Sequence, residues 1–309
     1  MNILFTGASS FSGYWMVYAL RKAGHRVVAP LRGQAGGYAD AKARRVAMLP
    51  GICAPRFGIN FGDDAFLKLI EADGPFDVLC HHAAEVRDYK SPDFDALAAT
   101  ASNVRNLVPV LRKLRENHCR RMILTGSVFE QNEGVGPEPR RAFSPYGLSK
   151  GLTSEFVKHY AEREGFSLGK FVIANPIGPL EEPRFISYLM KSWLAGQTPS
   201  VKTPAYVRDN IHVDLLAAAY ANMVETLPPD PGFVHYGPSG YVEAVGEFTQ
   251  RVSTEMSARL KLPCHVRLET QTDFSEPLYR VNSDRPDAGQ FQWSESEAWD
   301  KLANYYLGK

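Results

Sequence analysis

The sequence predicts an α/β protein built on a doubly wound parallel sheet. Through the first 176 residues, short apolar runs alternate with helical patterns, as they do in right-handed βαβ units. The runs are almost continuously apolar, which is typical of parallel strands that helices cover on both faces. A single run of this length is also compatible with a helix, so the prediction depends on the alternation and not on any one run.

The expected elements follow one another in a regular order. Buried strands are expected at residues 2–6, 26–31, 76–84, 120–126 and 169–176, and helices at residues 11–23, 93–117 and 146–163. After Pro176, proline and glycine become dense, the helical patterns shorten and strand candidates are scattered. We therefore expect a smaller, irregular lobe there, placed over the carboxyl ends of the sheet, where ligands bind in open α/β folds.

The composition is that of an ordinary soluble protein. The chain has 309 residues, 44% of them hydrophobic, and a formal net charge of +1, which argues against nucleic acid or a membrane surface as the main partner. The four cysteines form no CxxC pair, so we expect buried free thiols in a reducing compartment and no metal site. No apolar run approaches membrane-spanning length and no signal sequence precedes the first strand, which predicts a cytoplasmic protein.

The segment TGASSFSG, residues 6–13, lies between the first strand and the first helix. A strand, a glycine turn and a helix N-terminus form a pyrophosphate site, because backbone N–H groups and the helix dipole point at the anion. Gly7 permits the turn and Gly13 lets the helix pack closely, but Ser10 occupies the position where glycine usually lets the backbone approach the phosphates. We expect Ser9, Ser10 and Phe11 to line this Rossmann-type site; a glycine turn that binds nothing is the alternative.

The end of the second strand indicates which dinucleotide binds. A free ribose 2′-hydroxyl usually meets an acidic residue about twenty residues past the glycine loop. Here that position is Leu31, followed by Arg32, whose guanidinium can donate charge-assisted hydrogen bonds to the 2′-phosphate of NADP. The sequence therefore favours NADP over NAD, with a solvated surface charge as the alternative for Arg32.

Tyr146 and Lys150 in YGLSK lie four residues apart at a helix start, so their side chains share one helix face. As hydride moves to or from a carbon that bears oxygen, a tyrosine there can give or take the proton. The reference pKa of tyrosine, about 10, makes the phenolate cost roughly 4 kcal/mol at neutral pH, and a lysine ammonium lowers that cost. Thr125, at the tip of the strand at 120–126, offers a hydroxyl to the same oxygen.

With these motifs together, the chain resembles the extended short-chain dehydrogenase/reductase superfamily, in particular its nucleotide-sugar epimerase/dehydratase group. The resemblance covers nearly the whole length. It is carried by TGASSFSG (family TGxxGxxG), DVLCHHAA at 77–84 (HxAA), LTGSVFE at 124–130 (catalytic Ser or Thr), PYGLSK at 145–150 (the Tyr–Lys pair) and YVRDNIHVDLL at 206–216 (RDxxHVxDL). The chain departs from the family at Ser10, in the missing acid after the second strand, and at Thr100, which stands where the family has a helix asparagine.

The resemblance implies roles for individual residues. Toward the cofactor it implies Asp63 for the adenine amine, Ala83 and Ala84 for the cavity lining, Lys150 for the nicotinamide ribose, and Pro176 and Ile177 beside the nicotinamide amide, with Asp64 as a further contact. Toward the substrate it implies Asn175, and Arg208 for the diphosphate. Further substrate candidates are Glu85, Ser127 and Val201, and, by position alone, Arg184 and Arg280.

The residues after Thr125 narrow the reaction. Sugar dehydratases of this group carry an acidic pair there, whereas this chain has Gly126 and Ser127, so dehydration is disfavoured. We predict reduction of a 4-keto nucleotide sugar by NADPH; a 4-epimerase with tightly bound NAD(P) is the alternative, and a non-catalytic NADP-binding sensor is a remote one. We expect His81, His82 and His212 to be packed and hydrogen-bonded rather than catalytic.

The predicted organisation has two parts. Residues 1–175 form the dinucleotide-binding domain and residues 176–309 mainly a substrate-binding lobe, with a segment near 206–237 returning to the first domain. Leu148, Leu152 and Phe156 form an i, i+4 apolar stripe. The resemblance implies that the helices at 93–117 and 146–163 form a four-helix homodimer interface, and packing of the stripe on the sheet is the alternative. The nucleotide and the sugar stay open at this point.

Overall fold

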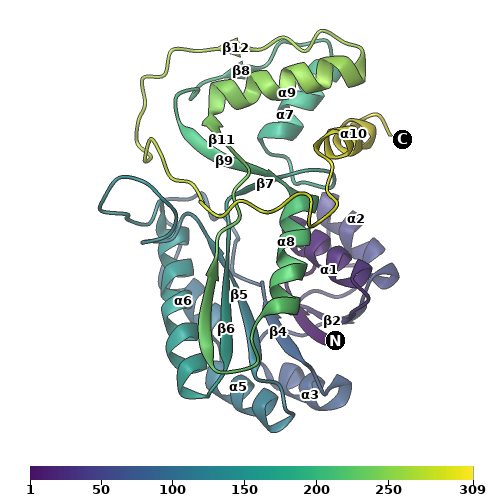
Figure 1. Ribbon diagram of the computed structural model, residues 1–309, viewed down its shortest axis with the longest axis vertical. Helices are drawn as coiled ribbons and strands as arrows, with labels where there is room; N and C mark the ends of the chain where they lie inside the picture. The colour runs from purple at the N-terminus through teal and green to yellow at the C-terminus, as the bar shows by residue number, and fades with distance from the viewer. Residues whose placement is uncertain (309) are drawn as a thin grey trace.

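The computed structural model describes residues 1–308 and has a seven-stranded parallel sheet at its centre (Figure 1). The strand order is β10-β6-β5-β4-β1-β2-β3, so the winding changes direction between β1 and β4. Ligands bind at such a switch point, outside the carboxyl ends of the strands. The strands are β1 (Asn2–Thr6), β2 (Arg26–Leu31), β3 (Ala54–Phe57), β4 (Val78–His81), β5 (Arg121–Ser127), β6 (Ser167–Ile173) and β10 (Gly232–Tyr236).

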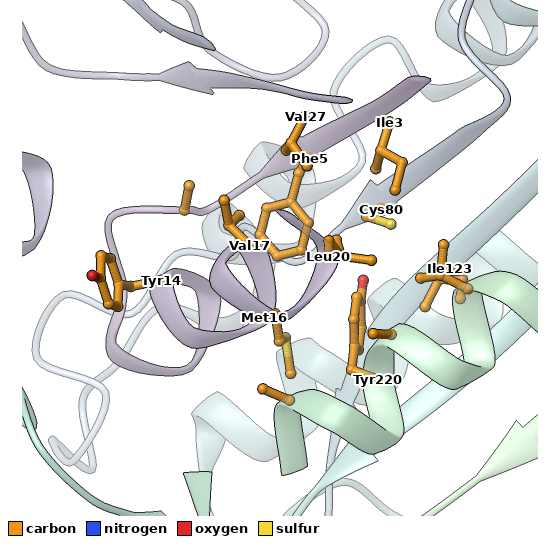
Figure 2. Close-up of a cluster of buried hydrophobic side chains, with 14 of the residues drawn as sticks. Ile3, Phe5, Tyr14, Met16, Val17, Leu20, Val27, Cys80, Ile123 and Tyr220 are labelled. Atoms are coloured by element: carbon orange, nitrogen blue, oxygen red, sulfur yellow. The ribbon is translucent and has the colours of Figure 1, made fainter. Parts of the chain in front are cut away.

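Helices cover both faces of this sheet, because alternate strand residues point to opposite sides. Ile3 and Phe5 of β1 face a core that includes α1 (Phe11–Lys22) and α8 (Val213–Thr226), and Figure 2 shows Phe5 in one cluster with Tyr220 of α8. Leu4 faces the opposite core, with α3 (Asp64–Asp73), α5 (Leu107–Glu116) and α6 (Pro145–Arg163). Side chains such as Phe5, fully removed from water, each contribute about 2 kcal/mol or more of burial free energy.

A second lobe lies at the carboxyl end of the sheet, at the top of Figure 1. It has a three-stranded sheet in the order β11-β9-β7 and a two-stranded sheet of β12 and β8. Its own core joins side chains such as Trp193, Phe248 and Trp299. The elements are β7 (Asn175–Ile177), α7 (Phe185–Leu194), β8 (Ser200–Val201), β9 (Val207–His212), β11 (Tyr241–Ala244), α9 (Val245–Leu260), β12 (Arg267–Leu268) and α10 (Glu295–Tyr306). Between β9 and β11 the chain returns to the main sheet, where β10 pairs with β6.

The expected helix at 93–117 is two helices, α4 (Ala96–Asn103) and α5. The break lies at Asn106, whose φ of +48° is left-handed and whose side-chain amide donates to the carbonyl of Gly62 at 2.7 Å. The periodic apolar pattern spans this break because both helices pack against α6. The prediction of one long helix was therefore wrong.

Three further expectations differ from the structure. The expected strand at 169–176 is divided, because β6 ends at Ile173 and Asn175 begins β7 in the other sheet. The strand expected at 76–84 is limited to Val78–His81. The helices after Pro176 are not shorter than the earlier ones, since α8 has 14 residues and α9 has 16. Within the first 176 residues, the elements without a sequence prediction are β3, α2 (Asp40–Met48), the 3-10 turn Leu49–Gly51 and α3; after Pro176 the sequence predicted no individual helix or strand.

The apolar stripe on α6 lies at the surface. The exposed fractions of Leu148 and Phe156 are 42% and 46%, so the stripe does not pack on the sheet. Cys80, Cys119 and Cys264 are buried free thiols, whereas Cys53 is only half-buried. Over residues 1–308, no helix combines the length and the apolar character that crossing a membrane requires.

Candidate active site

A cavity of about 1010 Å³ lies over the switch point of the sheet. Its wall combines the glycine loop after β1, the ends of β2, β4 and β5, the start of α6, and the residues that lead into α7. This volume is at the upper end of the range for small-molecule sites. The cavity is therefore large enough for an extended ligand that runs across the sheet.

The glycine loop forms a close cradle for an anion. Gly7 has a φ of +85°, and a Cβ there would lie 2.8 Å from the backbone nitrogen of Ala83. A Cβ at Gly13 would lie 2.3 Å from the carbonyl oxygen of Gly7, so both ends of the loop require glycine. The N-terminus of α1 faces the cavity through Ser10 and Phe11, and its unpaired N–H groups and dipole favour a phosphate.

Ser10, in place of the middle glycine, is the N-cap of α1. Its hydroxyl oxygen accepts the N–H of Gly13 at 3.1 Å, and its hydroxyl donates to the carbonyl of Gly7 at 2.9 Å. The side chain thus folds back into the loop and stabilises the same turn that the glycines form. The residues present therefore fit the pyrophosphate of a dinucleotide, which the free N–H groups at the N-terminus of α1 would hold, while Ser10 fixes the turn that presents them.

Positive charge gathers in the cavity wall at the end of β2. Arg32 and Lys42 both line the cavity, and the proximity of Arg32 adds to burial in lowering the pKa of Lys42. Arg32 pairs with Glu85 across the cavity, with 2.8 Å between Nη1 and Oε2. Burial raises the pKa of Glu85, but hydrogen bonds and charge from Arg32 and Arg87 outweigh it and lower the pKa to about 2.

Thr125, Tyr146 and Lys150 lie together in the wall where β5 meets α6. The ammonium of Lys150 donates to the backbone carbonyl of Thr125 at 2.6 Å, and burial lowers its pKa. The sequence led us to expect Lys150 to lower the pKa of Tyr146. Instead, burial and the charge of Glu130 raise the pKa of Tyr146, and only Arg184 acts in the opposite direction. Tyr146 therefore holds its proton over the neutral range.

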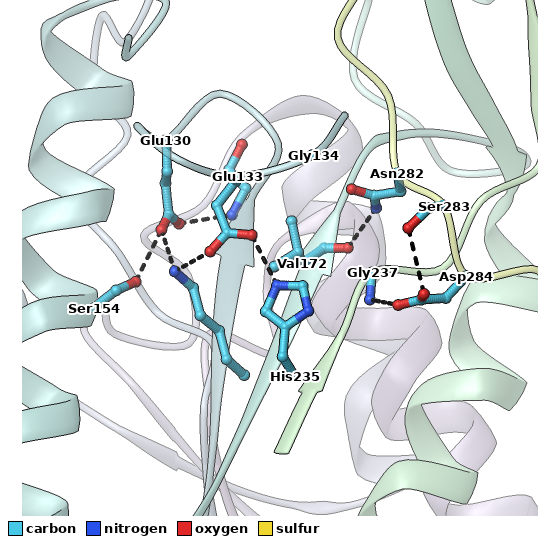
Figure 3. Close-up of polar contacts among 12 residues, drawn as sticks. Glu130, Glu133, Gly134, Ser154, Val172, His235, Gly237, Asn282, Ser283 and Asp284 are labelled. Carbon is cyan, nitrogen blue, oxygen red and sulfur yellow. Dashed lines mark hydrogen bonds and ion pairs between the residues drawn. The ribbon is translucent and has the colours of Figure 1, made fainter. Parts of the chain in front are cut away.

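A buried charge cluster supports the segment that follows Thr125, and Figure 3 shows Glu130 and Glu133 at its centre. Glu130 is fully buried and pairs with the ammonium of Lys170 at 2.7 Å, and Lys170 also pairs with Glu133 at 2.6 Å. The second carboxylate oxygen of Glu130 accepts the N–H of Ser127 at 2.7 Å. The cluster thus fixes the backbone just beyond Thr125.

A family model described as the NAD dependent epimerase/dehydratase family matches residues 3–237. The chain belongs to this family. It is thus an enzyme of the extended short-chain dehydrogenase/reductase type, with a Rossmann-like α/β fold. No curated protein sequence matched the chain.

Solved structures of epimerases and dehydratases share the whole fold with this epimerase/dehydratase family member. A dTDP-glucose 4,6-dehydratase from Streptomyces venezuelae, solved with NAD, has a TM-score of 0.73 at 19% identity and covers 100% of this chain and 98% of its own. A UDP-glucose 4-epimerase from Bifidobacterium longum, in complex with NAD+ and UDP, has a TM-score of 0.73 at 17% identity and covers 100% and 99%. A UDP-glucuronic acid 4-epimerase from Bacillus cereus has a TM-score of 0.70 at 19% identity and also covers 100% and 99%.

Most of the predicted site residues of this epimerase/dehydratase line this cavity. These are Gly7, Ser9, Ser10, Phe11, Arg32, Ala83, Ala84, Glu85, Thr125, Ser127, Tyr146, Lys150, Asn175, Pro176 and Arg184. Gly13, Asp63, Asp64, Ile177, Val201, Arg208 and Arg280 are not part of the wall. Asp63 caps α3 by accepting the N–H of Phe66 at 2.8 Å, and Ile177 is buried in the core of the second lobe.

The two predicted arginines outside the wall have structural partners. Arg208 pairs with Glu276 at 2.7 Å and donates to the carbonyl of Pro277 at 3.0 Å, so it lies behind the cavity-lining Glu276. Arg280 is buried and donates to the carbonyls of Glu130 and Arg141. Both guanidinium groups hold loops around the cavity, and a direct contact of either with substrate stays a prediction.

Sequence reasoning missed Lys42 and Asn103 in the wall and did not place His82 there. Lys42 follows β2 by a loop and a turn of helix, and no motif marks it. Thr100 was expected at the position where the family has a helix asparagine, but the α4 asparagine in the cavity wall is Asn103. Its amide oxygen accepts the N–H of Glu85 at 2.8 Å. His82 was expected to be packed and hydrogen-bonded, and its ring lies 3.0 Å from the hydroxyl of Thr125; what the sequence did not place is this contact with the proposed catalytic group. The sequence signal for this position was the HHAA motif, in which His82 is the second histidine.

Proposed function

We propose that the protein reduces the 4-keto group of a nucleoside-diphosphate sugar with NADPH. NADPH, held by the glycine loop and Arg32, would supply the hydride that the carbonyl carbon takes up. Tyr146 gives its phenolic proton to the oxygen as negative charge develops there, so the product is a secondary alcohol and the phenol is restored from solvent. Lys150 holds the backbone beside Thr125 and supplies positive charge to the same region, which stabilises that developing charge.

The choice of cofactor rests on one observation: two cationic side chains, Arg32 and Lys42, lie near each other in the cavity wall. A 2′-phosphate needs cationic donors, and the position after β2 that usually holds an acid is Leu31. Glu85 is the one carboxylate paired with Arg32 in the described part of the chain, and it reaches across from the end of β4. These charges favour NADP over NAD.

Two observations support reduction over dehydration. Burial raises the pKa of Tyr146, which favours the protonated phenol that a proton donor needs. The carboxylates in the wall, over residues 1–308, are Glu85, Glu182 and Glu276, and each of them is paired with an arginine. Dehydration needs acid–base groups at the sugar beyond Tyr146, and paired carboxylates are poorly suited to that role.

Arg184 supports a diphosphate-bearing substrate. It lines the cavity at the N-cap of α7, next to Phe185, the first residue of that helix. A guanidinium beside a helix N-terminus is a favourable site for a phosphate group. We therefore propose Arg184, rather than Arg208, as the first contact of the substrate diphosphate, with residues 176–309 mainly holding the substrate and residues 1–175 the cofactor.

A thermal-shift screen tests the ligand classes directly. Ligands that bind the folded state raise the melting temperature by an amount that grows with concentration over Kd. We expect NADP(H) to stabilise the protein more than NAD(H), and UDP or dTDP sugars to stabilise it further. A 4-epimerase, the alternative that uses the same three residues, is expected to carry tightly bound NAD(P) through purification. If no nucleotide sugar raises the melting temperature, the proposed substrate class is wrong.

We also propose a homodimer through α4 and α6. Leu97 on α4 is 76% exposed, and Leu148 and Phe156 are exposed on α6, which packs against α4. Large apolar side chains gathered on two adjacent helices favour a self-complementary interface. A mass measurement by light scattering at micromolar concentration checks this, and a monomer would contradict it.

A further inference from the structure

The imidazole of His82 joins the glycine loop to Thr125. Its Nε2 lies 3.0 Å from the hydroxyl oxygen of Ser10 and 3.2 Å from that of Ser12, and its Nδ1 lies 3.0 Å from the hydroxyl oxygen of Thr125. His82 follows β4, which lies between β1 and β5 in the sheet, so the ring reaches the loops on both sides. One side chain therefore contacts both the pyrophosphate loop and the site of proton transfer.

The contacts of Ser10 decide which ring nitrogen carries the proton. Its hydroxyl oxygen lies 2.9 Å from the carbonyl oxygen of Gly7, and two oxygens at that distance need a proton between them, which only the hydroxyl can supply. The same oxygen already accepts the N–H of Gly13 at 3.1 Å. The Ser10 oxygen therefore has only a lone pair left for His82 and must accept from it. Nε2 of His82 consequently carries the proton, and Nδ1 of the neutral ring does not.

The orientation of the Thr125 hydroxyl follows from that tautomer. A bare Nδ1 is an acceptor, so its 3.0 Å contact requires the hydroxyl proton of Thr125 to point at the ring. Burial, with the charge of Lys150, lowers the pKa of His82 to about 3, so the ring stays neutral at working pH. The hydroxyl proton of Thr125 is consequently directed at the ring of His82 and not into the cavity.

We propose that Ser10 and His82 hold Thr125 as a hydrogen-bond acceptor, so that the site binds the alcohol form of its sugar in preference to the keto form. The inference rests on the proposed function only in taking a sugar as the substrate. A hydroxyl at the reacting carbon can accept from Tyr146 and donate to Thr125. Each group then donates to the next: Thr125 to His82, His82 to Ser10, and Ser10 to a backbone carbonyl. Hydrogen bonds in such a chain strengthen one another. A carbonyl at that carbon has no proton to give Thr125.

This preference sets the direction of the reaction on the enzyme. His82 is a positioning residue, since it acts through Thr125 and lends no proton itself. By stabilising the bound alcohol relative to the bound ketone, it favours completed reduction. An epimerase needs the opposite, because its keto intermediate must persist long enough to rotate in the site.

The tautomer is measurable without substrate or turnover. Long-range ¹H–¹⁵N NMR spectra distinguish the two neutral imidazole tautomers, and the signals lost in His82→Asn assign the ring among the eight histidines. We expect the Nε2–H tautomer in the native protein. In Ser10→Gly, which removes the acceptor and retains a residue tolerated at an N-cap, we expect a mixture of tautomers. A native Nδ1–H tautomer would overturn the proposal.

The second readout is the ratio of bound alcohol to bound ketone, measured by quenching enzyme in excess over the nucleotide sugar at equilibrium with cofactor. In His82→Leu we expect this ratio to fall roughly fivefold, the effect of one hydrogen bond. In His82→Asn, whose amide oxygen can replace Nδ1 as acceptor, we expect it to stay within about twofold of the native value. His265→Gln, at an exposed histidine of the second lobe, is the matched control.

The outcomes separate this inference from the proposed function. An unchanged ratio in a folded His82→Leu protein, or an equal fall in His82→Leu and His82→Asn, would overturn the role of His82 as an acceptor for Thr125. If no 4-keto sugar is reduced but the Nε2–H tautomer is observed and an alcohol-form sugar binds more tightly than its keto form, the proposed reduction fails and the inference holds.

Discussion

Loss of the Glu85 carboxylate is expected to strengthen NADPH binding relative to NADH binding. In Glu85→Gln, the amide oxygen can still accept the N–H groups of Val86 and Arg87, which Glu85 Oε1 contacts at 3.1 and 2.9 Å, so the loop keeps its shape. The change releases Arg32 from its 2.8 Å ion pair. Half of the Arg32 side chain faces water, so screening limits that pair to about 1 kcal/mol. Release of Arg32 should therefore tighten NADPH binding about fivefold more than NADH binding.

Fluorescence titration of the purified protein with NADPH and NADH measures both dissociation constants. The ratio of the two is the readout, because removing any negative charge from the cavity also helps the shared pyrophosphate. Arg32→Ala is the matched control and should weaken NADPH binding about tenfold, with little effect on NADH. Equal tightening of both cofactors in Glu85→Gln would refute the assignment of Arg32 to the 2′-phosphate.

The remaining predictions concern catalysis, stability and assembly. Tyr146→Phe should lower kcat by about 10²-fold or more with an unchanged NADPH dissociation constant, and steady-state kinetics showing native kcat would refute its role as proton donor. Lys170→Met removes the cation that Glu130 and Glu133 share, leaves Glu133 only His235 as a partner, and should lower the free energy of unfolding by about 3–5 kcal/mol in urea titrations at pH 7; a loss below 1 kcal/mol would contradict this. Phe156→Glu should give a monomer by light scattering, and a persistent dimer would place the interface elsewhere. The hydrogen bond to Glu133 raises the pKa of His235, so its stabilisation is complete below the unfolded pKa of about 6.5 and is lost as pH rises through the folded pKa. His235→Gln should flatten that part of the stability profile, and an unaltered profile would exclude the pair as its cause.

The sequence was sufficient for those parts of the site that local physics determines. Gly7 must take a left-handed φ and Gly13 must meet the backbone of Gly7, so the loop is readable from glycine positions alone. Tyr146 and Lys150 share a helix face because of their spacing, wherever that helix packs. Alternation of apolar runs likewise predicts a parallel sheet, because both faces of each strand must be covered.

Other features depend on long-range packing and have no local signal. The break at Asn106 is fixed by its bond to Gly62, which is 44 residues away in the sequence. Arg208 occupies a family motif, yet its partner Glu276 comes from a distant segment that no local pattern places beside it. The role of His82 needs Ser10 and Thr125 at opposite ring nitrogens, and only the sheet order brings those two residues together.

The measurement that tests the account most directly is the stoichiometry of NADPH consumption with a UDP- or dTDP-4-keto sugar. We expect one NADPH to be oxidised for each sugar reduced, with NADH a poorer donor and a single alcohol epimer as product. Interconversion of two alcohol epimers without net oxidation of NADPH would contradict it and would make the enzyme an epimerase.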